Sequence, residues 1–411
     1  MRQSCGSSDS DRELVRAPRP ALFRRMRVDG SLQITAGQCL RLRSRYSDCE
    51  KCAQACPPRV LRVSNECIEL ADGCLRCAQC CAACPTDALK MEGLAANRLR
   101  ISAGKAPLYM DCWKVAASES PRDAVRVPCL GGIALRHLVR WHAASAGRRI
   151  VLIDRGWCGQ CSAGRRADHP AQGALEAARA LLAGLGAAEE ALPRLESLPL
   201  PRTRMPADIP EPLAAQPLSR RAFFAAITRR VAGITAPAAA DEAAERAQAP
   251  RPRLAKIDAT ARSQLMKDAA VLATRHGRPV LAELFPALRV SDTCRNHHVC
   301  TSICPTAALR AYRNDDDLVT GIVFDAAACI ACGDCVRACP EQALTLFPQG
   351  DGEVPGGATE LTRWSLRECH DCGDGFADFG SSDVCPTCRK TRELARADLS
   401  RLFSNVAKEP A

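Results

Sequence analysis

The cysteines constrain this chain more than any other feature of its sequence. The 411 residues include 26 cysteines, and most of them stand in runs with two or three residues between neighbours. This spacing is too tight for ordinary disulfide cross-links and is typical of thiolates that share a metal ion or an iron–sulfur cluster. Because metal-binding thiols must stay reduced, we expect a reducing compartment, the cytoplasm.

The remaining sequence features indicate which classes of partner are favoured. The N-terminus has arginines but no apolar stretch typical of a secretory signal, and no apolar run reaches the roughly 18 residues that span a bilayer. The formal charge is +11, but the arginines are scattered, which favours a solvated surface first and an acidic redox partner second. Nucleic acid ranks third, because aromatic residues make up 4% and no helix-turn-helix or aromatic–basic platform stands out.

The fullest cysteine motif lies in the C-terminal half of the chain. The sequence CIACGDCVRACP, which begins at Cys329, reads Cys-x2-Cys-x2-Cys-x3-Cys-Pro. The three close cysteines can wrap one cubane cluster, and the fourth can reach a second cluster. CLRCAQCCAACP, which begins at Cys74, has the same spacing, and a shortened form, CEKCAQACP, begins at Cys49. These runs favour iron–sulfur clusters over zinc.

An internal duplication follows these motifs. The segments CPTDALKM, CPTAALRA and CPEQALTL repeat one pattern. With these motifs the chain resembles the two-cluster bacterial ferredoxins, once over about 39–90 and again over about 294–346. The resemblance implies two βαβ halves around each pair of clusters and one-electron transfer. We place the two modules at 30–95 and 261–350.

The swapped-ligand rule of those ferredoxins implies four [4Fe–4S] clusters. The implied ligand sets are Cys39, Cys49, Cys52 and Cys84; Cys74, Cys77, Cys80 and Cys56; Cys294, His297, Cys300 and Cys339; and Cys329, Cys332, Cys335 and Cys304. The first set departs from the family pattern because Tyr46 occupies a cysteine position. Cys39 would supply that ligand from across a loop, and Cys67, in a short predicted strand, is the weaker alternative. Cys5 and Cys81 are left as spare thiols.

The third set departs from the pattern at His297, in CRNHHVCTSICP. Three interpretations compete: an imidazole ligand that completes a cubane, a [3Fe–4S] cluster without a fourth ligand, and an empty site on a solvated loop. His297 falls on the register position that Cys332 occupies in the other motif, which favours ligation. We expect His298 to point elsewhere if the loop keeps the ferredoxin path.

A middle region at 105–195 predicts an α/β domain. The apolar run IVLI predicts a buried strand that leads into Cys158 and Cys161, and Cys112 and Cys129 could complete a four-thiolate site. The motif RVPCLGG and this strand-then-cysteine turn resemble the delta-subunit family of methyl-viologen-reducing hydrogenases. The resemblance implies a [2Fe–2S] cluster that passes electrons to a partner enzyme. Structural thiols and a zinc site are the alternatives.

Two further segments complete the chain. Segment 366–390 has paired knuckles that predict a tetrahedral S₄ site, formed by Cys369, Cys372, Cys385 and Cys388. It resembles zinc ribbons and rubredoxins, and the lack of glycine after the second knuckle favours zinc over iron. Segment 196–260 is rich in proline and alanine and predicts a linker. Its SRRAFFAAITRR stretch predicts an amphipathic helix rather than a twin-arginine signal.

Together these patterns predict an α+β, multidomain iron–sulfur protein. No Rossmann glycine motif, phosphate loop, catalytic triad or zinc-protease motif is recognisable, so we expect an electron-transfer subunit that catalyses no bond chemistry by itself. It would relay single electrons between a larger oxidoreductase and a redox carrier. The alternatives are an assembly factor that docks on a redox enzyme and a redox-sensing nucleic-acid binder.

Overall fold

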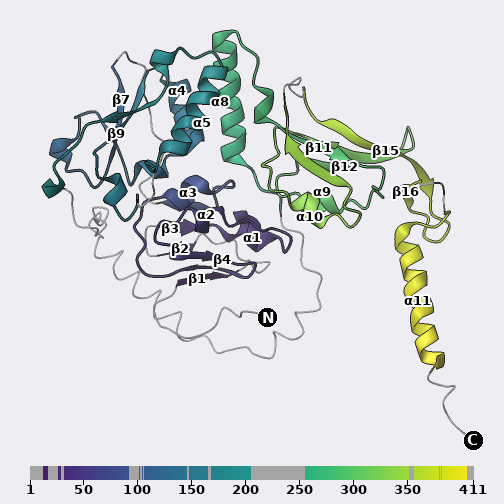
Figure 1. Cartoon of the computed structure of the whole chain (residues 1–411). Coiled ribbons are helices and arrows are strands. Elements are labelled where there is room, and N and C mark those ends of the chain that lie inside the picture. Colours follow the sequence, from purple (N-terminus) through teal and green to yellow (C-terminus); the bar gives the residue numbers. More distant parts are fainter. Residues whose placement is uncertain are drawn as a thin grey trace, which may run out of the picture. The chain divides into compact units, whose positions relative to one another are not determined.

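The computed structural model combines helices and sheets, so the fold is α+β. It describes residues 13–16, 26–28, 32–91, 101, 104, 106–145, 148–164, 168–204, 255–350, 356–378, 380 and 382–404. The chain forms two compact units, Met1–Ala255 with Ala259–Val280, and Lys256–Asp258 with Leu281–Ala411 (Figure 1). Cys5 and the predicted SRRAFFAAITRR helix lie outside the described residues. No helix in the described residues combines the length and the apolar composition needed to cross a membrane.

The N-terminal part of the first unit consists of two small antiparallel sheets and short helices. One sheet contains β2 (Met26–Val28), β3 (Leu32–Ile34) and β6 (Leu89–Met91). The other contains β1 (Glu13–Arg16), β5 (Cys67–Leu70) and β4 (Leu61–Val63). The cysteine runs lie on or beside α1 (Leu40–Arg43), α2 (Lys51–Gln54) and α3 (Gln79–Ala83). Alternate aliphatic side chains of β3 and β6 face the core, as the period of a strand requires.

The middle part of the first unit is a parallel sheet with helices packed on it. The strand order is β10 (Arg194–Ser197), β9 (Ile150–Asp154), β7 (Leu108–Cys112) and β8 (Val125–Val127). The predicted IVLI strand is β9, and its four aliphatic residues are fully buried, as is usual in parallel sheets. The helices are α4 (Leu135–Ala144), α5 (Gln172–Gly184) and α8 (Thr260–His276). Both α5 and α8 pack on α4.

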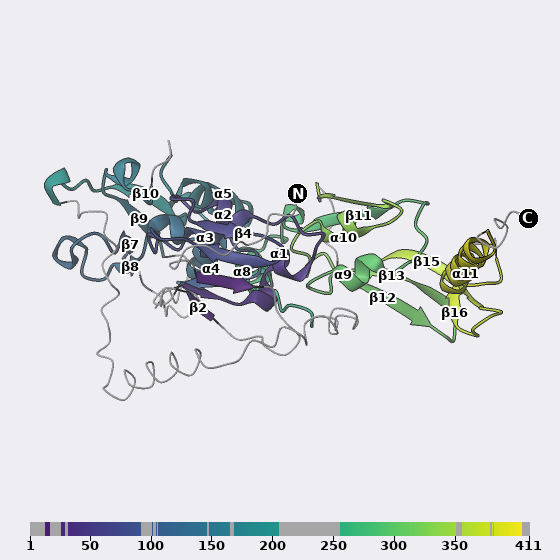
Figure 2. The same ribbon diagram turned by 90° about the horizontal axis from the view of Figure 1, so that it is seen from below.

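The second unit again combines two sheets with short helices. β11 (Pro286–Val290) pairs with β14 (Leu344–Pro348). The other sheet contains β12 (Leu309–Asn314), β13 (Val319–Phe324), β15 (Thr359–Glu368) and β16 (Gly375–Ala377). The helices are α9 (Val299–Ile303), α10 (Asp334–Ala338) and α11 (Pro386–Ser404). In Figure 2, β12, β13 and β15 lead toward β16, beside which α11 begins.

Candidate iron–sulfur and metal sites

Three cysteine loops share an unusual backbone shape. In each loop two residues adopt the left-handed conformation, which is uncommon outside glycine. These residues are Arg76 and Ala78, Asn296 and His298, and Ala331 and Gly333. Each pair flanks the central position of the Cys-x2-Cys-x2-Cys spacing, which is occupied by Cys77, His297 and Cys332. His297 therefore occupies the backbone position that a cysteine occupies in the other two loops.

In two of these loops a backbone N–H donates a hydrogen bond to a cysteine sulfur. The N–H of Asn296 donates to the Sγ of Cys294, and the N–H of Ala331 donates to the Sγ of Cys329, both over 3.4 Å. Amide donors of this kind stabilise the negative charge of a thiolate, whether it is free or bound to iron.

A second repeated turn follows each Cys-Pro pair. The third residue after the cysteine is left-handed in all four cases, at Arg59, Asp87, Ala307 and Gln342. After three of these turns a backbone N–H returns to the cysteine. These bonds join Ala88 to Cys84 over 3.3 Å, Leu309 to Cys304 over 3.5 Å, and Ala343 to Cys339 over 3.4 Å. The sequence duplication is therefore also a duplication of backbone geometry.

In the second unit each predicted ligand set lines one pocket. Cys304, Cys329, Cys332 and Cys335 meet in a pocket that Leu288, Phe324, Leu346 and other apolar residues enclose. Burial raises the pKa of Cys335 to about 12, and the nearby thiols of Cys304 and Cys329 add to the shift. Cys304 therefore lies with the cysteines of the other motif, the arrangement that the swapped-ligand rule requires.

Cys294, His297, Cys300 and Cys339 line the other pocket. The Nε2 of His297 lies 3.0 Å from a carboxylate oxygen of Glu341. A charged carboxylate there favours the tautomer with its proton on Nε2, which leaves the Nδ1 lone pair free for a metal. The expectation that His298 points elsewhere is wrong, because it also lines this pocket, and its Nε2 is buried with no hydrogen-bond partner among the described residues.

The first unit brings together the residues of the first predicted set. Burial raises the pKa of Cys39 to about 11, and the nearby thiols of Cys84 and Cys49 add to the shift. Burial also raises the pKa of Cys52, and the nearby thiols of Cys84 and Cys39 add to the shift. Cys39 is therefore placed to serve in the position that Tyr46 leaves without a thiol.

The second set gathers around Cys77 in the same way. Burial raises the pKa of Cys77 to about 12, and the nearby thiols of Cys80, Cys74 and Cys56 contribute. The alternative that Cys67 replaces Cys39 is wrong for this structure, because Cys67, in β5, is disulfide-bonded. Cys81 is buried in the core of this part of the unit. No cysteine of the four predicted sets takes part in a disulfide bond.

The middle cysteines gather at the carboxyl ends of parallel strands. Cys112 ends β7, Cys129 follows β8, and the loop with Cys158 and Cys161 follows β9. All four line a single pocket, at the edge of the sheet where α/β proteins bind ligands. Burial raises the pKa of Cys112 to about 12, and the nearby thiols of Cys129 and Cys161 contribute.

Polar groups surround this pocket. The Nζ of Lys114 lies 3.5 Å from the Sγ of Cys161. A carboxylate oxygen of Asp154, the Sγ of Cys158 and a ring nitrogen of His169 lie within 4.8 Å of one another. The Nδ1 of His169 accepts the N–H of Ala171, and its Nε2 is buried without a hydrogen-bond partner among the described residues.

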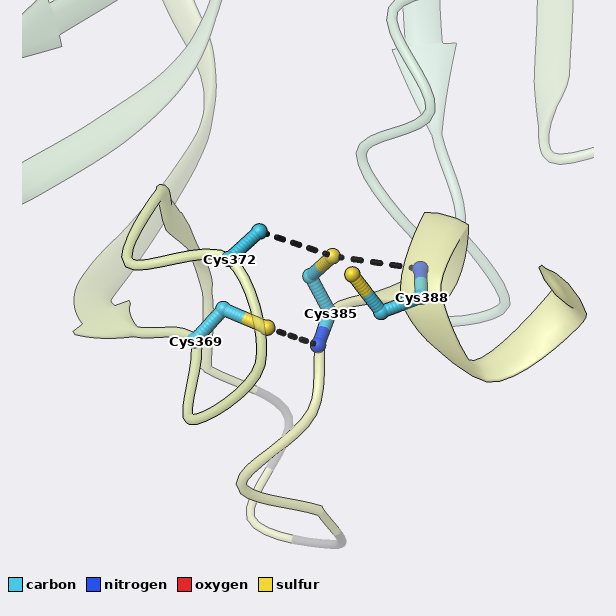
Figure 3. Close-up of side chains that lie close together, drawn as sticks. All are labelled: Cys369, Cys372, Cys385 and Cys388. Carbon is cyan, nitrogen blue, oxygen red and sulfur yellow. Dashed lines mark hydrogen bonds between the residues drawn. The ribbon is translucent and has the colours of Figure 1, made fainter. Parts of the chain in front are cut away.

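The sulfur atoms of the four C-terminal cysteines lie close together. These Sγ atoms lie within 4.8 Å of one another, the spacing that a single tetrahedral ion requires (Figure 3). The N–H of Cys385 donates to the Sγ of Cys369 over 3.2 Å, and this bond, with further backbone donors, lowers the pKa of Cys369. Cys369 follows β15, whereas Cys388 lies in the first turn of α11. The second Cys-x2-Cys pair therefore lies at the N-terminus of a helix. The positive end of the helix dipole is there, and it favours thiolates.

Sequence reasoning missed the residues that surround these ligands. Gln79, Lys114 and Glu341 contact the candidate ligands Cys129, Cys161 and His297, respectively. No spacing rule identifies them, because each contact joins residues more than 40 positions apart: the separations are 50, 47 and 44. The imidazole of His169, 11 residues beyond Cys158 in an irregular loop, likewise carries no sequence signal.

Two comparisons with known proteins support a 4Fe–4S-binding domain in this chain. A family model described as a 4Fe-4S binding domain matches residues 322–344. The polyferredoxin-like subunit of an aliphatic sulfonate oxidoreductase from Pyrococcus furiosus is 38% identical over 114 residues. These residues make up 26% of this chain and 61% of the relative, so the chain matches less than two thirds of that protein. The chain is an iron–sulfur protein with a ferredoxin-like 4Fe–4S-binding domain.

The donors in the pockets fit such clusters. Buried thiols with raised pKa values need a positively charged partner to ionise, and the iron of a cluster supplies one. A bound cluster adds the capacity to accept and release one electron. The protein contributes the thiolates, the amide donors to sulfur and the apolar walls that exclude water.

Proposed function

We propose that the chain is an electron-transfer subunit that relays single electrons between a larger oxidoreductase and a redox carrier. The observation that carries this proposal is the recurrence of one ligand-loop geometry in two parts of the chain, each with two predicted ligand sets. Several clusters in one chain make a relay, because an electron can move between neighbouring centres without bond chemistry. The name of the Pyrococcus furiosus relative supports a larger oxidoreductase as the partner.

The proposal assigns up to four [4Fe–4S] clusters to the four predicted sets. His297 would complete the third set through its Nδ1, and a three-iron cluster is the alternative there. The middle cysteines would hold a [2Fe–2S] cluster, supported by their shared pocket and the N–H donor of Lys114. The C-terminal cysteines would hold one structural zinc ion, with iron as the alternative.

A redox titration monitored by electron paramagnetic resonance (EPR) tests the relay. Full-length protein, purified without oxygen, should show several reversible one-electron reductions at low potential. A chain that binds clusters but undergoes no reversible reduction would contradict the proposal. The assembly-factor alternative instead requires a stable complex with an unmatured enzyme, which a pull-down detects.

A further inference from the structure

The middle pocket is closed by residues from the N-terminal, ferredoxin-like part of the same unit. Leu75 and Cys77 line it together with the four middle cysteines. Cys77, Cys129, Cys161 and Ala163 also form a separate buried cluster, and each of the four is at most 9% exposed. A candidate ligand of one site is therefore packed directly against two candidate ligands of another.

Gln79 joins the two sites by hydrogen bonds. It is the first residue of α3, two positions after Cys77, and it is 6% exposed. Its Nε2 donates to the carbonyl oxygen of Ala163 over 2.6 Å and to the Sγ of Cys129 over 3.8 Å. A buried amide is costly unless it is hydrogen-bonded, so this side chain is held in place at the middle cysteines.

The glycines of RVPCLGG permit this close approach. A Cβ at Gly132 would lie 2.8 Å from the carbonyl oxygen of Cys77. A Cβ at Gly131 would lie 3.0 Å from the side chain of Gln79. The loop after Cys129 can therefore reach the Cys77 loop only where it lacks side chains.

Arg136 stabilises the contact between the loop after Cys129 and the region around α3. It donates to the carbonyl oxygens of Ala82 and Cys81, over 3.1 and 3.4 Å, and pairs with Asp87 over 2.9 Å. Both charged side chains are largely buried, so the ion pair is shielded from solvent and salt. The contact is a packed interface that contains hydrogen bonds and an ion pair.

We propose that Gln79 is a positioning residue of the middle site, which holds Cys129 and sets the reduction potential of the group bound there. This inference rests on the proposed function, because it requires a cluster at the four middle cysteines. The Cys77–Cys129 face is then the protein contact across which one electron passes between the two sites. One site is oxidised as the other is reduced, and no bond or proton changes.

The decisive test compares wild-type full-length protein with Gln79→Leu by EPR-monitored titration. Gln79→Leu removes the N–H donor and fills the buried position with an apolar side chain of similar size. The middle-site signal is identified as the one that Cys129→Ser alters. Because an N–H donor stabilises the more negative, reduced state, Gln79→Leu should lower the midpoint potential of that signal. Gln172→Ala, which changes a half-buried glutamine of α5 that does not line the middle pocket, should leave it unchanged.

The outcomes separate this inference from the proposed function. An unchanged potential in Gln79→Leu, with the middle cluster present, overturns the inference alone. If Cys129→Ser alters neither iron content nor any signal, no cluster is bound there, and both statements fail. If Gln79→Leu loses the middle-site iron, the midpoint potential of the middle-site signal is measured in Gln79→Glu instead. It keeps the side-chain length, replaces the donor by a charge and should lower the potential further.

Discussion

His297 is the residue at which the second unit departs from an all-cysteine pattern. Its place between two left-handed residues matches Cys332, and its contact with Glu341 leaves Nδ1 available. A neutral imidazole in place of a thiolate makes a cluster one charge more positive, which raises its potential.

Substitution of His297 tests its role as a ligand. His297→Cys should keep four irons in this cluster and lower its potential, whereas His297→Ala should expose one iron corner. EPR and iron analysis distinguish these outcomes, and His276→Ala, which changes an exposed histidine at the end of α8, serves as the control that should preserve the wild-type signal. A three-iron signal in oxidised wild-type protein, without damage by air, would show that His297 is not a ligand.

The buried pair of Asp111 and Arg155 supports the strand edge at which the middle cysteines meet. Asp111 is fully buried, accepts the Nη2 of Arg155 over 2.7 Å and also accepts the hydroxyl of Ser120. Asp111→Ala should lower the free energy of unfolding by about 3–5 kcal/mol, because it leaves a buried guanidinium unpaired.

Denaturant unfolding, followed by tryptophan fluorescence, measures this loss. Trp141 and Trp157 are buried in the same part of the chain and report on it. Arg194→Ala is the control, since its exposed pair with Glu196 is worth at most about 1 kcal/mol. Equal midpoints for the two variants would refute a structural role for the buried pair.

At the scale of elements, the C-terminal site links the end of β15 to the start of α11. Cys372→Ser should release the bound metal and increase proteolysis of α11, and it should leave the cluster spectra unchanged. Metal analysis and limited proteolysis provide the readouts. His370→Ala removes an exposed neighbour of Cys369 and should keep the metal. Full metal retention by Cys372→Ser would contradict an S₄ site.

Local patterns predicted several of these elements. The run IVLI predicted β9, and the turn that carries Cys158 and Cys161 follows this strand as predicted. The packing of α8 on α4 was not predictable, since the two helices lie on either side of a long segment, and only tertiary contacts place α8 in the first unit. The role of Gln79 depends in the same way on contacts 50 and 84 residues away.

At the scale of the whole molecule, we propose that most of the cysteines hold clusters rather than form cross-links. The ferredoxin resemblance implied which thiols would share a site, and these ligand sets stay predictions. The repeat of the Cys-Pro turns in the sequence is matched by a repeat of backbone geometry. The module boundaries at 30–95, 105–195, 261–350 and 366–390 stay predictions. Contacts instead group residues 259–280 with the first unit, because α8 packs there.

Iron and acid-labile sulfide analysis of the full chain, purified without oxygen, tests the central claim most directly. Four cubanes predict about 16 irons per chain, and a [2Fe–2S] cluster raises this to about 18, with a similar amount of sulfide. Fewer than about eight irons in carefully reconstituted protein would contradict the presence of two two-cluster modules.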